Sequence, residues 1–278
     1  MKIVKIFNNN IVATIAEDKT EMVVTGSGIG FHKHIGDMLE ESRIEKTYVL
    51  DQSQQNKLFQ LCQSVPSVYV MISEEIIDYA SKQLKKKVSD QIMISLTDHI
   101  VFAVKRQKDG IQIPNLLLSE IKMLYRSEFE IGLWALDYIE LQLKIRLPID
   151  EAGYIAMHLV NATLDGKQTA VSEIIEFSKG IIDLIETTFD ISLDCNSLSY
   201  SRLMTHLKFL AQRKLVDVSP TVFEFEQNED MYVMLLYKYP QMQICVKKIR
   251  SFVKNSFDCN LNKEEILYIM IHITKIIH

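Results

Sequence analysis

Four histidines stand in repeated patterns, and imidazole is the side chain best suited to proton or phosphoryl transfer near neutral pH. The segment Glu151–His158 has the pattern E-x-x-Y-x-x-x-H, and the segment Glu265–His272 repeats it. Residues at i, i+3 and i+7 lie on one face of a helix. Each copy therefore presents a carboxylate, a phenol and an imidazole along one stripe.

A second pattern precedes each of these segments. Leu96–Arg106 and Leu203–Arg213 share L-x-x-H-x-x-F-x-x-x-R, which places His99 and His206 at equivalent positions. The copies are 107 residues apart for this pattern and 114 residues apart for the first one. Such offsets indicate a duplicated domain of roughly a hundred residues, in which the histidines form the pairs His99 with His158 and His206 with His272.

Four roles are compatible with such histidines, one structural and three chemical. A single histidine on an apolar helix is most often a hydrogen-bonded core residue, but a core residue does not require the repeated pairing. A metal-dependent phosphohydrolase with Asp98, His99 and His158 as ligands is one alternative, although no H-E-x-x-H pair is present. General acid–base catalysis needs a substrate pocket, and the glycine-poor helical region has no loop pattern for one. Phosphorylation, which adds about two negative charges to an imidazole, fits the repeated pairs best.

The two copies differ in ways that predict different electrostatics. Thr205 occupies the position of Asp98, so the second pair lacks an adjacent carboxylate. Asn262 and Glu265 have the spacing of a capping box, so Glu265 could serve the start of its helix instead of the histidine.

Composition sets the broad class of protein. With 278 residues, 47% hydrophobic and 24% charged, the chain suits two or three globular domains. The net charge of −5 argues against coating nucleic acid or a membrane by bulk electrostatics. We expect no membrane insertion, no signal peptide and no cofactor. The cysteines form no C-x-x-C pair and predict free thiols in the cytoplasm: Cys62, Cys195, Cys245 and Cys259.

The first fifty residues predict a small all-β domain. Short β-branched runs separated by turn residues indicate a four-stranded antiparallel sheet, with strands at Lys2–Phe7, Ile11–Ala16, Glu21–Thr25 and Ile44–Leu50. A sheet of this size buries little apolar surface. We therefore expect it to dimerise.

The glycine-rich segment Gly26–Phe31 follows the third expected strand. It resembles part of a dinucleotide fingerprint, but no βαβ unit surrounds it. A flexible turn and a nucleic-acid surface both remain open. In the second case glycines allow close backbone approach, Phe31 stacks on a base, and Asn10 bonds a base edge.

From Lys57 onward the hydrophobic period becomes helical, which predicts two duplicated all-α bundles. The polar segment Asp51–Asn56 is the expected linker. We expect Ser73-Glu74-Glu75 to open one helix and Pro114 another. The predicted domains are 1–56, 57–168 and 169–278.

Three segments carry a resemblance to a known family. MKIVKIFNNN at the start, the stretch Gly26–Asp37, and R-I-E-K-T-Y-V-L at 43–50 resemble the RNA-binding domain of bacterial transcriptional antiterminators of the LicT/SacY/BglG family. The duplicated histidine domains are similar to that family's sugar-phosphotransferase regulation domains. The resemblance covers the whole chain in the family's order.

The resemblance implies an RNA-binding surface in the first domain. Its residues would be Lys5, Asn10, Gly26, Ser27, Gly28 and Phe31. Many members have a basic residue where this chain has Ser27, and His32 or Lys33 would compensate. The dimer would bind an RNA antiterminator hairpin and prevent formation of a terminator ahead of sugar-uptake genes.

The resemblance also implies how this regulator, which is not an enzyme, is switched. The phosphoacceptors would be His99, His158, His206 and His272. A sugar-permease IIB component would inactivate the dimer by phosphorylating the first regulation domain. The phosphocarrier protein HPr would activate it by phosphorylating the second. A DNA-binding activator with the same regulation domains is a further alternative, but it needs a helix-turn-helix, and residues 1–50 do not read as helices.

Overall fold

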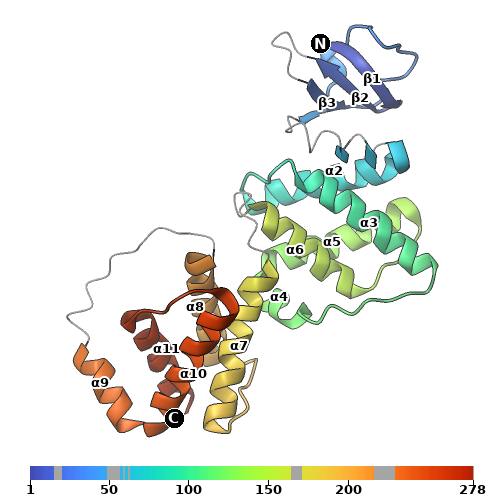
Figure 1. Ribbon diagram of the computed structural model, residues 1–278. Coiled ribbons are helices and arrows are strands. Elements are labelled where there is room, and N and C mark those ends of the chain that lie inside the picture. The colour runs from blue at the N-terminus through green and yellow to red at the C-terminus, as the bar shows by residue number, and fades with distance from the viewer. Residues whose placement is uncertain are drawn as a thin grey trace. The chain divides into compact units, whose positions relative to one another are not determined.

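The computed structural model describes residues 1–15, 21–48, 57–58, 60–61, 63–163, 171–215 and 229–277. The expected linker at 51–56 lies outside these residues. Two compact units can be separated, Met1–Gly166 and Lys167–His278. Figure 1 shows a small sheet near the N-terminus and two groups of helices.

The N-terminal part is the expected four-stranded antiparallel sheet, in the order β1-β2-β3-β4. Its strands are β1 (Lys2–Asn8), β2 (Ile11–Ile15), β3 (Glu21–Thr25) and β4 (Lys46–Tyr48), and a 3-10 turn, η1 (Glu41–Arg43), precedes β4. Each strand pairs antiparallel with its neighbour in sequence. The four strands are those predicted, with shifts of a few residues at their ends.

Alternating side chains give the sheet two apolar faces. One face packs under the loop that follows β3, and its buried residues are Ile3, Val12, Val24, Ile29 and Leu39. On the other face Ile11, Val23 and Tyr48 join the helical core of the same unit. There the Tyr48 hydroxyl donates to Glu74 Oε1 at 2.9 Å. Burial raises the pKa of Glu74.

The helices of the first unit form a bundle. They are α2 (Ser67–Leu84), α3 (Ile92–Lys108), α4 (Leu118–Leu124), α5 (Arg126–Leu143) and α6 (Ile149–Thr163). Helix α6 packs against α3, α4 and α5, and α5 packs against α2, α4 and α6, so these two helices form the centre of the bundle. The core is aliphatic, with Ile100, Ala135, Ile139, Ile155 and Leu159 fully buried.

Two predicted helix starts are wrong. Ser73 lies inside α2, which begins directly after Pro66. The Ser73 hydroxyl donates to the carbonyl of Tyr69 four residues back, so it does not cap a new helix. Pro114 does not begin a helix either, because the Asn115 N–H donates to the side chain of Asp150 and holds this segment as a loop before α4.

The second unit repeats the helical architecture. Its described helices are α7 (Val171–Phe189), α8 (Leu198–Leu215), α9 (Glu229–Lys238), α10 (Pro240–Phe257) and α11 (Lys263–Ile276). Helix α7 packs against α8 and α10, and α8 packs against α11. These are the all-α duplicated bundles predicted from the change of hydrophobic period.

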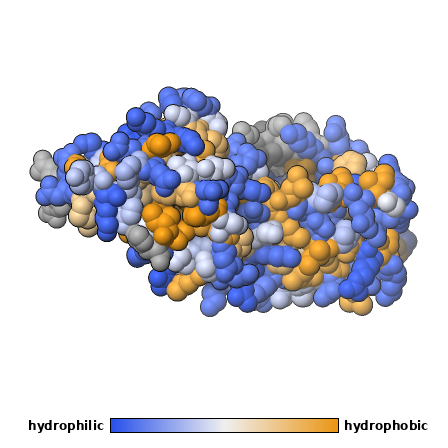
Figure 2. Space-filling view, turned by 90° about the horizontal axis from the view of Figure 1, so that it is seen from below, coloured by the Kyte–Doolittle hydropathy of each residue, from blue (hydrophilic) through white to orange (hydrophobic). Residues whose placement is uncertain are grey.

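The surface mixes polar and apolar residues. Figure 2 shows hydrophobic residues in separate patches among hydrophilic ones on the face that it displays. Exposed large hydrophobic side chains include Met234 and Tyr237 on α9. Within the described residues, no helix has the length and apolar character needed to cross a membrane.

The close contact of α5 with α6 depends on Gly132. A β-carbon at this position would lie 2.3 Å from the carbonyl oxygen of Ala152. Gly132→Ala gains about 1 kcal/mol of helix propensity, but the clash with backbone costs about 1–3 kcal/mol or more. We expect a net loss of stability, measured as a lower urea midpoint. Ser127→Ala on the exposed side of α5 is the matched control, and an unchanged midpoint for Gly132→Ala would contradict this packing.

Candidate functional site

The first histidine pair converges at the contact between α3 and α6. His99 comes from α3 and His158 from α6, and their ring centroids are 5.0 Å apart. The phenol of Tyr154 lies 5.8 Å from the His99 ring, centroid to centroid. The structure therefore brings together residues from both sequence patterns, as the repeat predicted.

A buried carboxylate links this pair to an arginine. Glu151 is 3% exposed, and its Oε1 accepts a hydrogen bond from Arg106 Nη2 at 2.8 Å. Its Oε2 lies 3.0 Å from His99 Nε2, an ion pair when the imidazole is protonated. The angles of this second contact fall short of an aligned hydrogen bond. The sequence pattern places Glu151 on the same helical face as His158, but in the structure Glu151 contacts His99 on the neighbouring helix.

The charges around Glu151 decide its ionisation. Burial by itself would raise the pKa of the Glu151 carboxyl, but His99 and Arg106 together hold that pKa below its usual value. The carboxylate is therefore ionised at neutral pH. Arg106 belonged to the repeated pattern, but no role had been predicted for it.

His158 is a neutral imidazole beside a surface cavity. Burial, aided by the nearby His99, lowers its pKa to about 4. It lines a cavity of about 340 Å³ together with Ser89, Ser95 and Asn161. A neutral ring retains a nitrogen lone pair, which is what an attack on an electrophile requires.

The second histidine pair has the same geometry. His206 on α8 and His272 on α11 have ring centroids 5.3 Å apart, and the Tyr268 ring lies 5.7 Å from His206. Burial, together with His272 and Arg213, lowers the pKa of His206 to about 4. Burial also lowers the pKa of His272, with Lys275 and Arg202 adding to the effect.

The carboxylate of the second copy has a different task. Glu265 and Asn262 form a capping box at the start of α11, as their spacing predicted. Glu265 Oε1 also lies 2.9 Å from Lys214 Nζ. The Thr205 hydroxyl, at the position of Asp98, donates to the carbonyl of Ser201 at 2.8 Å. Both copies therefore have paired imidazoles, but the carboxylates at equivalent positions of the repeated pattern, Glu151 and Glu265, contact different residues.

A metal site is not supported at either pair. Among the described residues, no group of three or more His, Cys, Asp or Glu side chains is placed to hold a metal ion. Asp98, a ligand in the phosphohydrolase alternative, is exposed and has no place in the Glu151 cluster. The geometry gives this alternative no ligand set.

The glycine-rich loop of the N-terminal domain is held in one conformation. Gly28 has φ +65°, and a β-carbon at Gly26 would lie 1.9 Å from the carbonyl oxygen of Arg43. The Asn10 side-chain oxygen accepts the Gly28 N–H at 2.9 Å. Asn10 thus fixes the loop with its oxygen, while its amide nitrogen donates one hydrogen bond to Met71 Sδ at 3.5 Å and keeps a second N–H for a base edge. Phe31 follows the loop with 52% of its surface exposed.

One carboxylate contacts this loop, and a lysine of the proposed surface lies on β1. The Ser27 N–H donates to Glu45 Oε1 at 3.0 Å. The ammonium of Lys5 lies 5.2 Å from the ring centroid of Phe7. Each of these predicted residues lies in the sheet domain.

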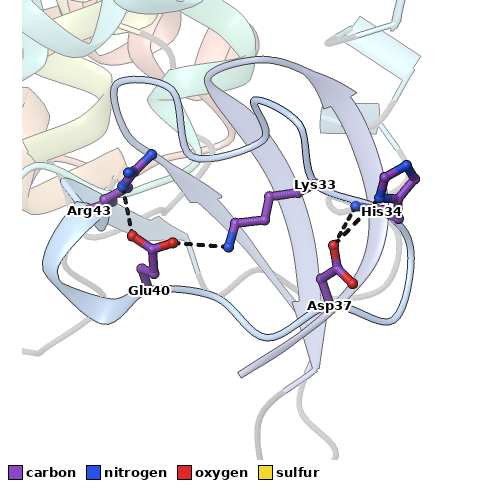
Figure 3. A network of polar contacts seen from close by, with 5 residues as sticks. All are labelled: Lys33, His34, Asp37, Glu40 and Arg43. Atoms are coloured by element: carbon purple, nitrogen blue, oxygen red, sulfur yellow. Dashed lines mark hydrogen bonds and ion pairs between the residues drawn. The ribbon is translucent and has the colours of Figure 1, made fainter.

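Figure 3 shows a network that the sequence did not reveal. Glu40 lies between Lys33, at 3.0 Å, and Arg43, at 2.8 Å. In the same figure the His34 N–H donates to Asp37 at 2.7 Å. The backbone carbonyl of Arg43 packs against Gly26, so this cationic residue lies next to the glycine-rich loop. Its short 3-10 turn gave no sequence pattern that could have indicated this position.

Comparisons with known proteins agree with this arrangement. Residues 1–57 match the family described as CAT RNA binding domain, and residues 74–162 and 179–276 each match the PRD domain. The transcription antiterminator LicT of Bacillus subtilis (strain 168) is 39% identical over 278 residues, covering 100% of this chain and 99% of LicT. The beta-glucoside operon antiterminator of Dickeya chrysanthemi is 38% identical, covering 99% of this chain and 96% of that protein.

A solved structure gives the same result for the N-terminal half. The crystal structure of GlcT CAT-PRDI matches with a TM-score of 0.54 and 33% identity, covering 58% of this chain and 97% of that one. The fold and the matched domains define a non-enzymatic regulator, a PRD-regulated RNA-binding transcription antiterminator. The chain belongs to the LicT/BglG family, with a CAT RNA-binding domain and two PRD domains.

The lowered pKa of His158 predicts loss of stability in acid. Between its usual pKa of 6.5 and its folded pKa of about 4, the unfolded chain binds a proton that the folded chain does not. The free energy of unfolding therefore falls as pH drops through this window, by about 1.4 kcal/mol per pH unit for one such group. His206 adds a similar contribution in the second unit.

We expect His158→Gln to reduce this pH dependence in urea unfolding followed by circular dichroism from neutral pH to about pH 4.5. The comparison uses the slope against pH, so a change in absolute stability does not affect it. His34→Gln is the control, since the His34 side chain is 87% exposed. An unchanged slope for His158→Gln would show that this ring is not buried as a neutral group.

Proposed function

We propose that two copies of the chain bind one partly paired RNA hairpin through their CAT domains and so prevent an overlapping terminator from forming. Transcription then continues into genes for sugar use, and the protein acts in the cytoplasm. The dimer is not needed to cover the sheet, since one face of the sheet packs on the helical core of its own unit; support for it comes from apolar side chains left exposed on the domain. Ile35 and Met38, exposed on the same domain, are apolar side chains that a partner could cover.

The proposed RNA surface consists of residues around the glycine loop. It comprises Lys5, Asn10, Gly26, Ser27, Gly28 and Phe31. The exposed ring of Phe31 offers a stacking platform for an unpaired base. At Ser27, where the family resemblance implies a basic residue, His32 or Lys33 would compensate, and Lys33 would have to leave its ion pair with Glu40 to do so.

The switch is proposed to be phosphorylation of His99, His158, His206 and His272. The observation that carries it is the convergence of each histidine pair, at 5.0 and 5.3 Å, in surroundings of unlike charge. A phosphoryl group in the first domain would stand near the ionised Glu151 and be repelled by it.

In the second domain the charges that act on the histidines are mostly positive, with Glu265 the one carboxylate that acts on His206. Arg213 acts on His206, and Arg202 and Lys275 act on His272. A phosphoryl group there gains attractive partners. The balance of charge therefore differs between the two pairs, which supports the proposal that phosphorylation inactivates through the first domain and activates through the second.

The proposed donors are components of the sugar phosphotransferase system. The phosphocarrier protein HPr would serve the second regulation domain, and a sugar-permease IIB component the first. The domain limits 1–56, 57–168 and 169–278 remain part of the proposal, since the linkers around residues 56 and 168 lie outside the described residues.

Phe31→Ala is expected to weaken RNA binding. Loss of one stacked base costs about 1–3 kcal/mol, or roughly 5- to 150-fold in affinity. The measurement is a gel shift of the full chain with a partly paired RNA hairpin. Phe102→Ala is a matched control, because Phe102 is an equally exposed phenylalanine on α3. Equal affinities for the two variants would argue against this RNA surface.

Incubation with phosphorylated HPr is expected to give acid-labile phosphate on the second domain. Because an imidazole is the acceptor, His206→Ala combined with His272→Ala should remove this phosphate. The control combines His32→Ala with His34→Ala, two histidines outside the repeat, and should retain it. Phosphate that persists without both His206 and His272 would exclude them as the acceptors.

A further inference from the structure

The two domains bury opposite nitrogens of equivalent histidines. In His99 the buried nitrogen without an aligned hydrogen bond is Nε2, which faces Glu151. In His206 it is Nδ1, which has no hydrogen-bond partner among the described residues. The ring nitrogen left toward the surface is therefore Nδ1 in His99 and Nε2 in His206. Equivalent positions of the two sequence patterns thus differ in orientation.

We infer that the first domain accepts a phosphoryl group on Nδ1 of His99, the second on Nε2 of His206, and that Glu151 is the residue that positions the His99 ring. The inference rests on the proposed phosphorylation switch and adds to it the atom that reacts. It assigns different phosphohistidine isomers to two sites that look equivalent in sequence.

Glu151 directs the His99 ring with one oxygen while Arg106 holds the other oxygen in place. Arg106 occupies Oε1, and Oε2 faces His99 Nε2. Although this contact is not an aligned hydrogen bond, the negative charge of the ionised carboxylate 3.0 Å away favours a proton on Nε2. The lone pair of the neutral ring then lies on Nδ1, where an incoming phosphorus can reach it.

The transfer balances with these groups alone. The Nδ1 lone pair attacks phosphorus, and the bond from phosphorus to its donor breaks with its electron pair staying on the donor. The ring keeps its Nε2 proton and becomes an imidazolium with a phosphoryl group on Nδ1. Glu151 faces that proton, so its negative charge stabilises the cation that forms.

The second domain lacks this arrangement. Glu265 Oε2 accepts the N–H of Asn262 and Oε1 contacts Lys214, so neither oxygen is directed at His206. Attack by Nε2 leaves a proton on the buried Nδ1 of His206, with no carboxylate in contact. His206 is therefore expected to react by the other nitrogen and without assistance from the equivalent glutamate.

The tautomer can be measured without any phosphoryl donor. Long-range proton–nitrogen NMR of the full chain with nitrogen-15 histidine distinguishes the two tautomers, and His99→Gln assigns the signals. We expect His99 to carry its proton on Nε2, whereas in His206 no carboxylate favours a proton on the buried Nδ1. A proton on Nδ1 of His99 would overturn the inference, whether or not the protein is a phosphotransferase target.

The isomer can be measured with phosphoramidate, a small chemical donor that needs no partner protein. One full-length variant keeps only His99 of the four repeat histidines, with glutamine at the other three, and a second keeps only His206. A variant with glutamine at all four gives the background of the remaining histidines. Circular dichroism checks that each is folded. Phosphorus NMR should show Nδ1-phosphohistidine in the first variant and Nε2-phosphohistidine in the second.

Glu151→Gln tests the positioning role in the variant that keeps His99. Because it preserves the shape and removes the charge, we expect the rate at Nδ1 to fall about tenfold. Glu265→Gln in the variant that keeps His206 is the matched control and should leave the rate unchanged. The same isomer in both domains, or equal rates with and without the Glu151 charge, would overturn the inference. Failure of HPr to phosphorylate the chain would instead contradict only the proposed function.

Discussion

A buried carboxylate is the constraint on which the first PRD domain depends. Removing an ion such as that of Glu151 from water costs several kcal/mol unless partners replace the water. Here Arg106 and His99, both from α3, are the partners of a residue on α6. The pairing ties α3 to α6 at the place where the two imidazoles meet. A charge added to either ring therefore acts directly on a helix–helix contact.

The second PRD domain has the same helical architecture, but its equivalent carboxylate, Glu265, makes different contacts. Glu265 is held at the start of α11 by its capping box with Asn262 and by Lys214. It stabilises a helix end where Glu151 stabilises a helix–helix contact. Duplication has thus preserved the spacing of residues while their interactions have diverged. The paired rings are common to both domains, but only in the first does the carboxylate contact a ring directly.

Much of the fold followed from local patterns. The four strands, the change to helical period and the Glu265 cap each depend on residues close in sequence, so they were predictable. The pairing of Glu151 with His99 could not be predicted from the sequence. Glu151 lies on the same face of its helix as His158, and only the packing of α3 on α6 brings it to His99 instead. The wrong prediction of a helix start at Ser73 has a related cause. A serine can cap a helix or bond back to the preceding turn, and the uninterrupted apolar face of α2 favours the second.

The glycine loop of the CAT domain has a thermodynamic consequence. Its backbone is already fixed by the Asn10 side chain and by the close packing of Gly26 on Arg43. A loop that is ordered before it meets a ligand loses little chain entropy on binding. More of the interaction energy at this surface is then available to discriminate one ligand shape from another. Rigidity here makes selectivity a property of the loop itself.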